Sequence, residues 1–291
     1  MHLCAGSINK FGNKAMSDKT MKISFIGGGN MGEAIIASLI IHKLVRPEDI
    51  SVADINSERQ IYLKQKYGLF ATDSNLEAAV RGEAVLLAVK PQQLDEVAQE
   101  LKGSLKNDQF IISIIAGKKL SVLRQGLGHE LIVRAMPNTP AQIGRGMTVW
   151  TATEPTSAEH RTYAETLLST MGRAIYTPNE AVLDMATAVS GSGPAYVFLF
   201  MEALIAAGQG LGLTPELSRL LTLETVLGAT EYARESGKDL DELRRNVTSP
   251  GGTTAAALRA FEEGKFTDLI GQAVNAAYQR AQELGSPDRL A

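Results

Sequence analysis

Residues 22–32 read Lys22-Ile23-Ser24-Phe25-Ile26-Gly27-Gly28-Gly29-Asn30-Met31-Gly32. A short apolar run is followed at once by a G-x-G-x-x-G pattern, and a segment of helical composition continues from Ala34 to Ile41. In this context the glycines allow a tight strand-to-helix turn, and a pyrophosphate can approach the free N–H groups of the helix N-terminus. The pattern therefore predicts a dinucleotide site. The alternative is a glycine-rich turn that binds no ligand.

Continuous apolar runs recur beyond this segment. They cover Ile50 to Ala53, Ala84 to Val89, Phe110 to Ile115 and Leu131 to Met136, and polar-faced helical segments such as Ser57 to Tyr67 lie between them. Runs of this kind are typical of parallel strands buried on both faces, joined by right-handed helical crossovers. We therefore expect a Rossmann-type, doubly wound α/β sheet. Met147 to Trp150 and Ala174 to Tyr176 are expected as added strands around a helix from Ser157 to Met171.

The sequence changes character after Pro178. Strand-like runs stop there, and Ala, Leu and Glu recur at helical spacing to the C-terminus. We expect a Rossmann domain over residues 21–178 and an all-α domain over 179–291. The polar residues 1–20 contain no secretory signal, and we expect them to form a disordered extension. Pro194 to Ala207 is strongly apolar but shorter than the roughly 20 residues that a bilayer requires, so we expect a buried helix.

The composition excludes several classes of protein. The chain has 291 residues and a formal net charge of −3, which gives no general attraction to nucleic acid or to an anionic membrane. Cys4 is the single cysteine, which excludes a disulfide framework and a thiolate metal cluster. The four histidines have no pair at helical ligand spacing, so we expect no metal site. The cysteine content fits a reducing cytoplasm.

Asp54 ends the second predicted strand, about 20 residues after the last glycine of the loop. An acid at this place binds the ribose 2′-hydroxyl and favours NAD over NADP. Asn56 and Arg59 follow closely, and either could instead reach a 2′-phosphate. The alternative is a helix N-cap near Ser57 with ordinary surface charges around it. The sequence leaves the choice of dinucleotide open.

Two further segments lie at the carboxyl ends of predicted strands, where ligands bind in open α/β sheets. One is Ala88-Val89-Lys90-Pro91 and the other is Met136-Pro137-Asn138-Thr139-Pro140. The second forms a rigid loop whose Asn138 amide and Thr139 hydroxyl could meet a nicotinamide carboxamide. A purely structural turn is the alternative.

The predicted helical domain contains two small, polar, glycine-rich segments, each expected to open a helix. They are Ser190-Gly191-Ser192-Gly193-Pro194-Ala195-Tyr196 and Thr248-Ser249-Pro250-Gly251-Gly252-Thr253-Thr254. Helix N-termini of this kind aim backbone N–H groups at anions such as carboxylates. Capping and close helix packing are the alternative for either segment alone. Two such segments beside a dinucleotide domain favour a small anionic substrate.

Neither segment contains His, Lys, Asp or Glu. Reducing a ketone usually requires a positioned proton donor, because an alkoxide develops in the transition state. A protonated imine is already activated, and a hydroxyl such as that of Thr254 suffices to hold its nitrogen. The residues therefore favour reduction of a C=N bond.

These segments together resemble the bacterial Δ1-pyrroline-5-carboxylate reductase family, over about Lys22 to Leu284. The resemblance rests on the glycine loop, Ala88 to Pro91, Met136 to Pro140, Ser190 to Tyr196 and Ser249 to Thr254. It implies that NAD(P)H delivers a hydride to the imine carbon of L-1-pyrroline-5-carboxylate, which gives L-proline in the last step of proline synthesis. It also implies homodimers with interleaved helical domains, some of which assemble into decamers of five dimers.

The resemblance also assigns site residues. Ser249, Gly251, Gly252 and Thr253 would bind the substrate carboxylate, and Thr254 would contact the ring nitrogen as the catalytic residue. The implied cofactor-binding residues are Ile26, Gly27, Gly28, Gly29, Asn30, Met31, Gly32, Asp54, Asn56, Asn75, Ala88, Val89, Lys90, Pro91 and Asn138. The family favours NADP(H), whereas Asp54 stands where members that prefer NADPH often have an uncharged residue, which makes NAD(H) plausible. Residues 1–20 lie outside the family pattern.

Two other functions compete with the reduction of an imine. β-Hydroxyacid dehydrogenases also place helices after a Rossmann domain, but their catalytic Lys, four residues after a glycine-rich loop, is replaced here by Val197. Val can neither donate nor accept a proton. A non-catalytic nucleotide sensor explains the glycine loop but gives no reason for two anion-binding segments in the helical domain.

Overall fold

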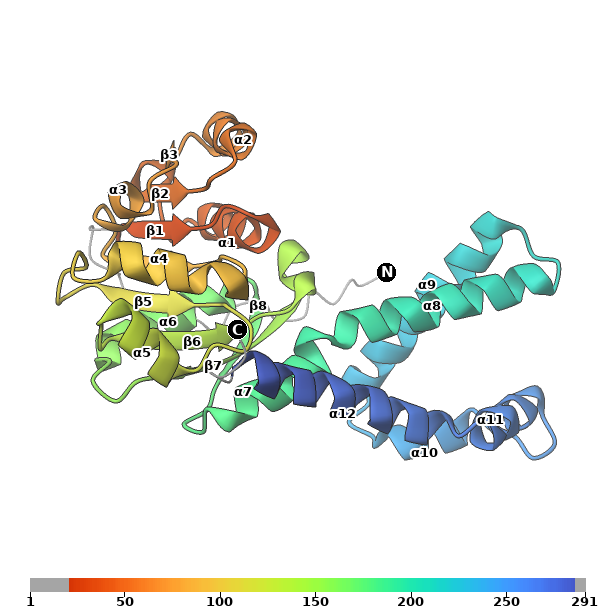
Figure 1. Ribbon diagram of the computed structural model, residues 1–291. Helices are drawn as coiled ribbons and strands as arrows, with labels where there is room; N and C mark the ends of the chain where they lie inside the picture. Colours follow the sequence, from red (N-terminus) through yellow and green to blue (C-terminus); the bar gives the residue numbers. More distant parts are fainter. Residues whose placement is uncertain (1–20, 286–291) are drawn as a thin grey trace.

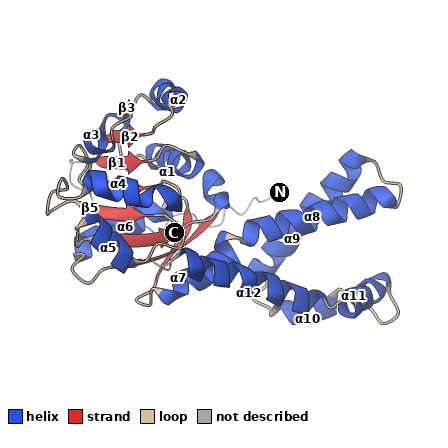
Figure 2. Cartoon of the chain, viewed as in Figure 1, coloured by secondary structure: helices blue, strands red, loops and turns tan. Residues whose placement is uncertain are grey.

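The computed structural model describes residues 21–285. The predicted extension over residues 1–20 lies outside the described residues. The chain has a strand-rich part, followed from Ala181 by helices (Figures 1 and 2).

The strand-rich part is one eight-stranded sheet in the order β3-β2-β1-β4-β5-β6-β7-β8. Its strands are β1 (Ile23–Ile26), β2 (Ile50–Ala53), β3 (Phe70–Thr72), β4 (Ala84–Leu87), β5 (Phe110–Ser113), β6 (Ile132–Met136), β7 (Gly146–Ala152) and β8 (Gly172–Tyr176). All neighbours are parallel except β6 and β7, which are antiparallel. The first six strands have the order typical of dinucleotide-binding sheets, whose switch point lies between β1 and β4. The doubly wound sheet and its two added strands are confirmed.

Helices cover both faces of this sheet. They are α1 (Asn30–Ile41), α2 (Ser57–Tyr67), α3 (Asn75–Ala79), α4 (Leu94–Leu101), α5 (Leu120–Leu127) and α6 (Ala158–Ser169). One core packs α1, α2 and α6 against alternate strand residues such as Ala84 and Leu86. The other packs α3, α4 and α5 against their neighbours Val85 and Leu87. Burial on both faces is the reason the parallel strands are mostly apolar and do not alternate with polar residues.

The helical part consists of α7 (Ala181–Ala186), a π-helical turn (Thr187–Gly191), α8 (Gly193–Gly210), α9 (Pro215–Glu235), α10 (Leu240–Asn246), α11 (Thr253–Glu263) and α12 (Phe266–Leu284). Figure 1 shows α8 and α9 as an antiparallel pair that extends away from the sheet, while α12 runs back towards it. A buried ion-pair cluster fixes the junction: Arg134 of β6 donates to Glu180 at 2.8 Å and to Asp184 at 2.7 Å.

Two expectations for this part need correction. Ser190 to Tyr196 does open α8, with Ser192 as the N-cap residue, but it is not a separate loop, because the π-helical turn joins α7 to α8 in a helix that runs from Ala181 to Gly210. Its amides, such as that of Ser192, which donates to the Thr187 carbonyl oxygen at 2.8 Å, bond within the turn. The apolar helix is also not buried within the chain: α8 has no buried residue, and Leu199 is 67% exposed.

The continuous helix is longer than the apolar run suggested. At 30 residues it is long and apolar enough to cross a membrane by length and composition alone. Such a test does not distinguish a bilayer span from a helix that packs against a partner chain.

Candidate active site

Backbone crowding explains two of the three patterned glycines. Gly27 has a φ of +99°, and a Cβ on it would lie 2.8 Å from the Ala88 carbonyl oxygen. A Cβ on Gly32 would lie 2.6 Å from the carbonyl oxygen of Gly27. These two positions therefore require glycine for the turn and for close contact between β1, α1 and β4.

Gly29 differs from both, because a Cβ on it would have no atom within 4 Å. It is the N-cap residue of α1, and no side chain of the described part of the chain caps this helix. The start of α1 is thus uncapped and has open space beside Gly29. An absent side chain and an uncapped helix N-terminus fit a pyrophosphate group.

A cavity of about 320 Å³ lies beside this loop, at the carboxyl ends of β1, β2 and β4. Its lining includes seven of the predicted cofactor-binding residues: Gly27, Gly29, Asp54, Asn75, Ala88, Val89 and Lys90. Sequence reasoning missed Asp73, Gln93, Glu96 and Glu100, which also line it. These four lie in short connections and on helix faces with no distinctive motif, so their spacing in the sequence did not indicate a binding site.

Other predicted residues support the loop from inside the protein. Ile26 is fully buried in the core beneath the sheet. Gly28 is also buried, and a Cβ on it would lie 2.7 Å from Leu63 Cδ1. Asn30, Met31 and Gly32 form the first turn of α1, and Pro91 opens a short 3-10 turn after β4.

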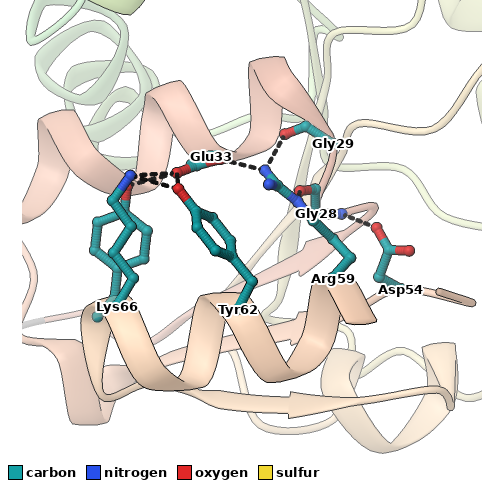
Figure 3. Close-up of polar contacts among 8 residues, drawn as sticks. Gly28, Gly29, Glu33, Asp54, Arg59, Tyr62 and Lys66 are labelled. Atoms are coloured by element: carbon teal, nitrogen blue, oxygen red, sulfur yellow. Dashed lines mark hydrogen bonds and ion pairs between the residues drawn. The ribbon is translucent and has the colours of Figure 1, made fainter. Parts of the chain in front are cut away.

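Asp54 links the glycine loop to the segment after β2. Its Oδ2 accepts from the Gly28 amide at 2.9 Å (Figure 3). Its Oδ1 accepts from the Asn56 amide at 2.9 Å. The side-chain oxygen of Asn56 in turn accepts from the amides of Glu58 and Arg59 and caps α2. The helix-cap alternative for this segment is therefore correct for Asn56, while Asp54 still lines the cavity.

A cluster around Glu33 was not foreseen from the sequence. The carboxylate of this α1 residue accepts from Tyr62, Lys66 and Tyr67 at 2.8–2.9 Å and pairs with Arg59, all from α2 or its end (Figure 3). Burial raises the pKa of Glu33, but the hydrogen bonds from these four donors outweigh it and lower the pKa to about 2. No sequence pattern pairs residues of two different helices, so this cluster required the structure.

Asn138 and Asn75 both have protein partners. The Asn138 amide donates to the Ser190 carbonyl oxygen at 3.1 Å, and its side-chain oxygen accepts from the Met147 amide at 2.9 Å. These contacts tie the loop after β6 to β7 and to the π-helical turn, which favours the structural-turn alternative. Asn75 donates to Glu100 at 2.7 Å across the cavity wall.

The loop from Thr248 to Thr254 opens α11 as expected. Gly252 is the N-cap residue, and no described side chain caps the helix. Gly251 has a φ of +70°, and a Cβ on Gly252 would collide with the Ser249 hydroxyl. Ser249 and Thr253 are exposed and Thr254 is half-buried. The loop therefore offers backbone N–H groups and hydroxyls to an anion.

The two halves of the predicted site do not meet within one chain. Figure 1 shows α11 at the end of the helical part that lies away from the sheet, where it packs against α12. The glycine loop and its cavity lie on the sheet. A site that uses both sets of residues must therefore receive one of them from another copy of the chain.

Comparisons with known proteins agree with this geometry. The family model described as pyrroline-5-carboxylate reductase dimerisation matches residues 180–284, and the model described as NADP oxidoreductase, coenzyme F420-dependent, matches residues 22–117. The chain is 42% identical over 266 residues to pyrroline-5-carboxylate reductase of Synechocystis sp., which covers 91% of this chain and 99% of that protein.

Solved structures give the same result. The pyrroline-5-carboxylate reductase of Coxiella burnetii superposes with a TM-score of 0.83 at 40% identity, covering 92% of this chain and 100% of that chain. Plasmodium falciparum pyrroline carboxylate reductase with NADP bound superposes with a TM-score of 0.84 at 32% identity, covering 91% and 98%. The chain belongs to the pyrroline-5-carboxylate reductase family.

Proposed function

We propose that this protein reduces L-1-pyrroline-5-carboxylate to L-proline with NAD(P)H, the final step of proline biosynthesis. The observation that carries the proposal is the start of α11. It combines an uncapped helix N-terminus with hydroxyl groups, and the loop from Thr248 to Thr254 contains no ionisable side chain. That chemistry suits a carboxylate-bearing substrate whose imine is already protonated.

On the nucleotide side, the glycine loop and the start of α1 would bind the pyrophosphate, and Asp54 would face the adenosine ribose. Ala88 to Lys90 form the opposite wall of the same cavity. When bound, NAD(P)H supplies the hydride. The protein would hold the pyrophosphate through backbone N–H groups and the adenosine ribose through the Asp54 carboxylate.

On the substrate side, the amides around Ser249, Gly251, Gly252 and Thr253 would bind the carboxylate. The Thr254 hydroxyl would accept a hydrogen bond from the protonated ring nitrogen and so orient the imine carbon. Hydride addition to that carbon neutralises the cation and leaves a secondary amine, so no proton has to be transferred during the chemical step. Orientation and desolvation are therefore the main contributions of these residues.

The helical part would complete the site through a homodimer. Leu199, Leu220, Leu227 and Leu269 on α8, α9 and α12 are more than half exposed in the single chain, which is unusual for a stable monomer. A second copy of the same surface would cover them, and the matched dimerisation model spans these helices. This pairing explains the apolar helix from Ala181 to Gly210 without a bilayer. A decamer of five dimers and a cytoplasmic location belong to the same proposal.

The direct test is oxidation of NADPH and NADH, in parallel, by the purified full-length protein with L-pyrroline-5-carboxylate. We expect both absorbance loss and stoichiometric formation of proline, identified by mass. A protein that binds either nucleotide without producing proline would contradict the proposal and favour the nucleotide sensor.

A further inference from the structure

Arg59 lies near the expected position of the adenosine ribose but is turned away from it. It stands in the first turn of α2, shortly after Asp54, where a guanidinium could pair with a 2′-phosphate. Instead, its Nε donates to the Gly28 carbonyl oxygen at 2.5 Å and its Nη2 pairs with Glu33. Figure 3 shows the side chain reaching along the glycine loop to α1.

Glu33 is a firmly held partner for this guanidinium. Its side chain is 16% exposed, and it also accepts from Lys66 and Tyr67, so several groups of α2 fix its position. Its pKa of about 2 means that the carboxylate is charged at any physiological pH. Moving Arg59 towards the ribose would leave this carboxylate without one of its two cationic partners, the other being Lys66.

The cavity beside Arg59 is acidic. Asp54, Asp73, Glu96 and Glu100 line it, and Lys90 is the one cation among the described lining residues. A 2′-phosphate adds up to two negative charges, which these carboxylates would repel, whereas a ribose 2′-hydroxyl can donate a hydrogen bond to Asp54.

We propose that Glu33 sets the dinucleotide preference of this protein in favour of NADH, by holding Arg59 against the glycine loop and away from the 2′-position of the adenosine ribose. This inference rests on the proposed function only in that the cavity binds a nicotinamide dinucleotide. Glu33 is a positioning residue here, since it acts through Arg59 and does not touch the nucleotide itself.

The test compares dissociation constants of NADH and NADPH, measured by fluorescence titration of the full-length protein without imine. The wild-type protein should bind NADH more tightly. Glu33→Met keeps a helix-forming side chain of similar length but frees Arg59, and it should shift the ratio of the two constants about tenfold or more towards NADPH. Asp54→Ser is a less clean probe, because it removes the carboxylate and the Gly28 contact together.

Three variants separate the effect of releasing Arg59 from other effects of removing the Glu33 carboxylate. The double variant Glu33→Met/Arg59→Met should lose the shift, because the phosphate-binding cation is absent. Arg59→Met alone should leave the wild-type ratio within about twofold, since Arg59 does not contact the ribose. Tyr67→Phe is the matched control: it removes another donor to Glu33 and leaves the Arg59 pair intact, so the ratio should not change. Thermal melting without nucleotide checks that each variant folds.

Two results would overturn the inference. One is an unchanged ratio in folded Glu33→Met. The other is a wild-type preference for NADPH, and its loss in Arg59→Met would show that Arg59 already binds the phosphate. Because the titration uses no imine, both results are independent of turnover, whereas a protein that binds neither dinucleotide would contradict the proposed function as well.

Discussion

Single residues divide into those that the fold requires and those that a ligand requires. A side chain on Gly27 or Gly32 would collide with backbone atoms, whereas Gly29 faces open space. The sequence pattern treats all three alike, so only the structure distinguishes Gly29 as the glycine that the fold does not require. Asp54 has both kinds of role. It lines the cavity, and its carboxylate also accepts a hydrogen bond from the Gly28 amide.

Gly29→Asp should abolish dinucleotide binding without loss of stability. Aspartate is a favoured N-cap residue, and the backbone at Gly29 is extended, so the variant should cap α1 and melt at an equal or higher temperature. Its carboxylate would stand where the pyrophosphate binds. Fluorescence titration and thermal melting measure the two effects. Unchanged NADH affinity would show that the pyrophosphate binds elsewhere.

Thr254→Ala should lower turnover strongly while leaving dinucleotide affinity unchanged. The hydroxyl of Thr254 is proposed to orient the imine nitrogen, and loss of one such hydrogen bond typically costs about 10-fold or more in rate. Thr254→Ser should recover most of the activity. Thr253→Ala is the matched control, since Thr253 contributes its backbone N–H. Equal catalytic efficiency in Thr254→Ala would remove this residue from the mechanism.

At the scale of elements, the sequence predicted a strand or helix correctly where residues close together in the chain determine it. The predicted segments Ile50 to Ala53 and Ser57 to Tyr67 coincide with β2 and α2. The three-residue strand β3 was missed, because Phe70–Thr72 is too short to show a period. The π-helical turn was taken for a loop, since its Gly and Ser residues usually end helices.

Contacts between side chains of different elements could not be predicted from the sequence. Glu33 on α1 joins α2 through four donors, and this link couples the glycine loop to the helix that follows β2. Arg134 similarly joins the sheet to α7. Such pairs are far apart in the chain, and neither spacing nor hydrophobic period points to them.

The Glu33 cluster should make stability depend on pH in the acid range. The folded state lowers the pKa of Glu33 from 4.5 to about 2, so its stabilising contribution is complete above pH 4.5 and is lost as the pH falls towards 2. The difference in urea midpoint between wild type and Glu33→Met should therefore be largest near neutral pH and shrink below about pH 4.5. A constant difference over this range would mean that the cluster does not stabilise the charged carboxylate.

At the scale of the whole molecule, the single chain accounts for the sheet but not for the exposed helices. Sequence reasoning predicted a buried α8, and this would hold only if another chain covers it. Periodicity reports that a face is apolar but does not report which chain buries it. The same limit applies to the predicted site, because its two sets of residues lie apart in one chain.

Leu199→Glu should dissociate the proposed dimer. Leu199 is 67% exposed within the chain, so the substitution should not unfold it, but a charge buried in an apolar interface costs about 3 kcal/mol or more, which raises the dissociation constant over 100-fold. Sedimentation should detect monomers with lowered activity. Ile61→Glu on α2, where Ile61 is 54% exposed, is the control and should stay dimeric. An unaltered dimer in Leu199→Glu would place the interface elsewhere.

Subunit complementation tests most directly whether the two halves form one reductase site across a dimer. Gly29→Asp blocks the nucleotide half, and Thr253→Glu places a carboxylate against the substrate carboxylate at a helix N-terminus, where an acid favours folding. Each variant alone should be inactive. Co-expressed chains should recover about one quarter of the wild-type rate per subunit, because half of random dimers are mixed and each has one intact site. Mixed dimers with no activity above the two parent variants would contradict a shared site and require each chain to bind substrate and nucleotide by itself.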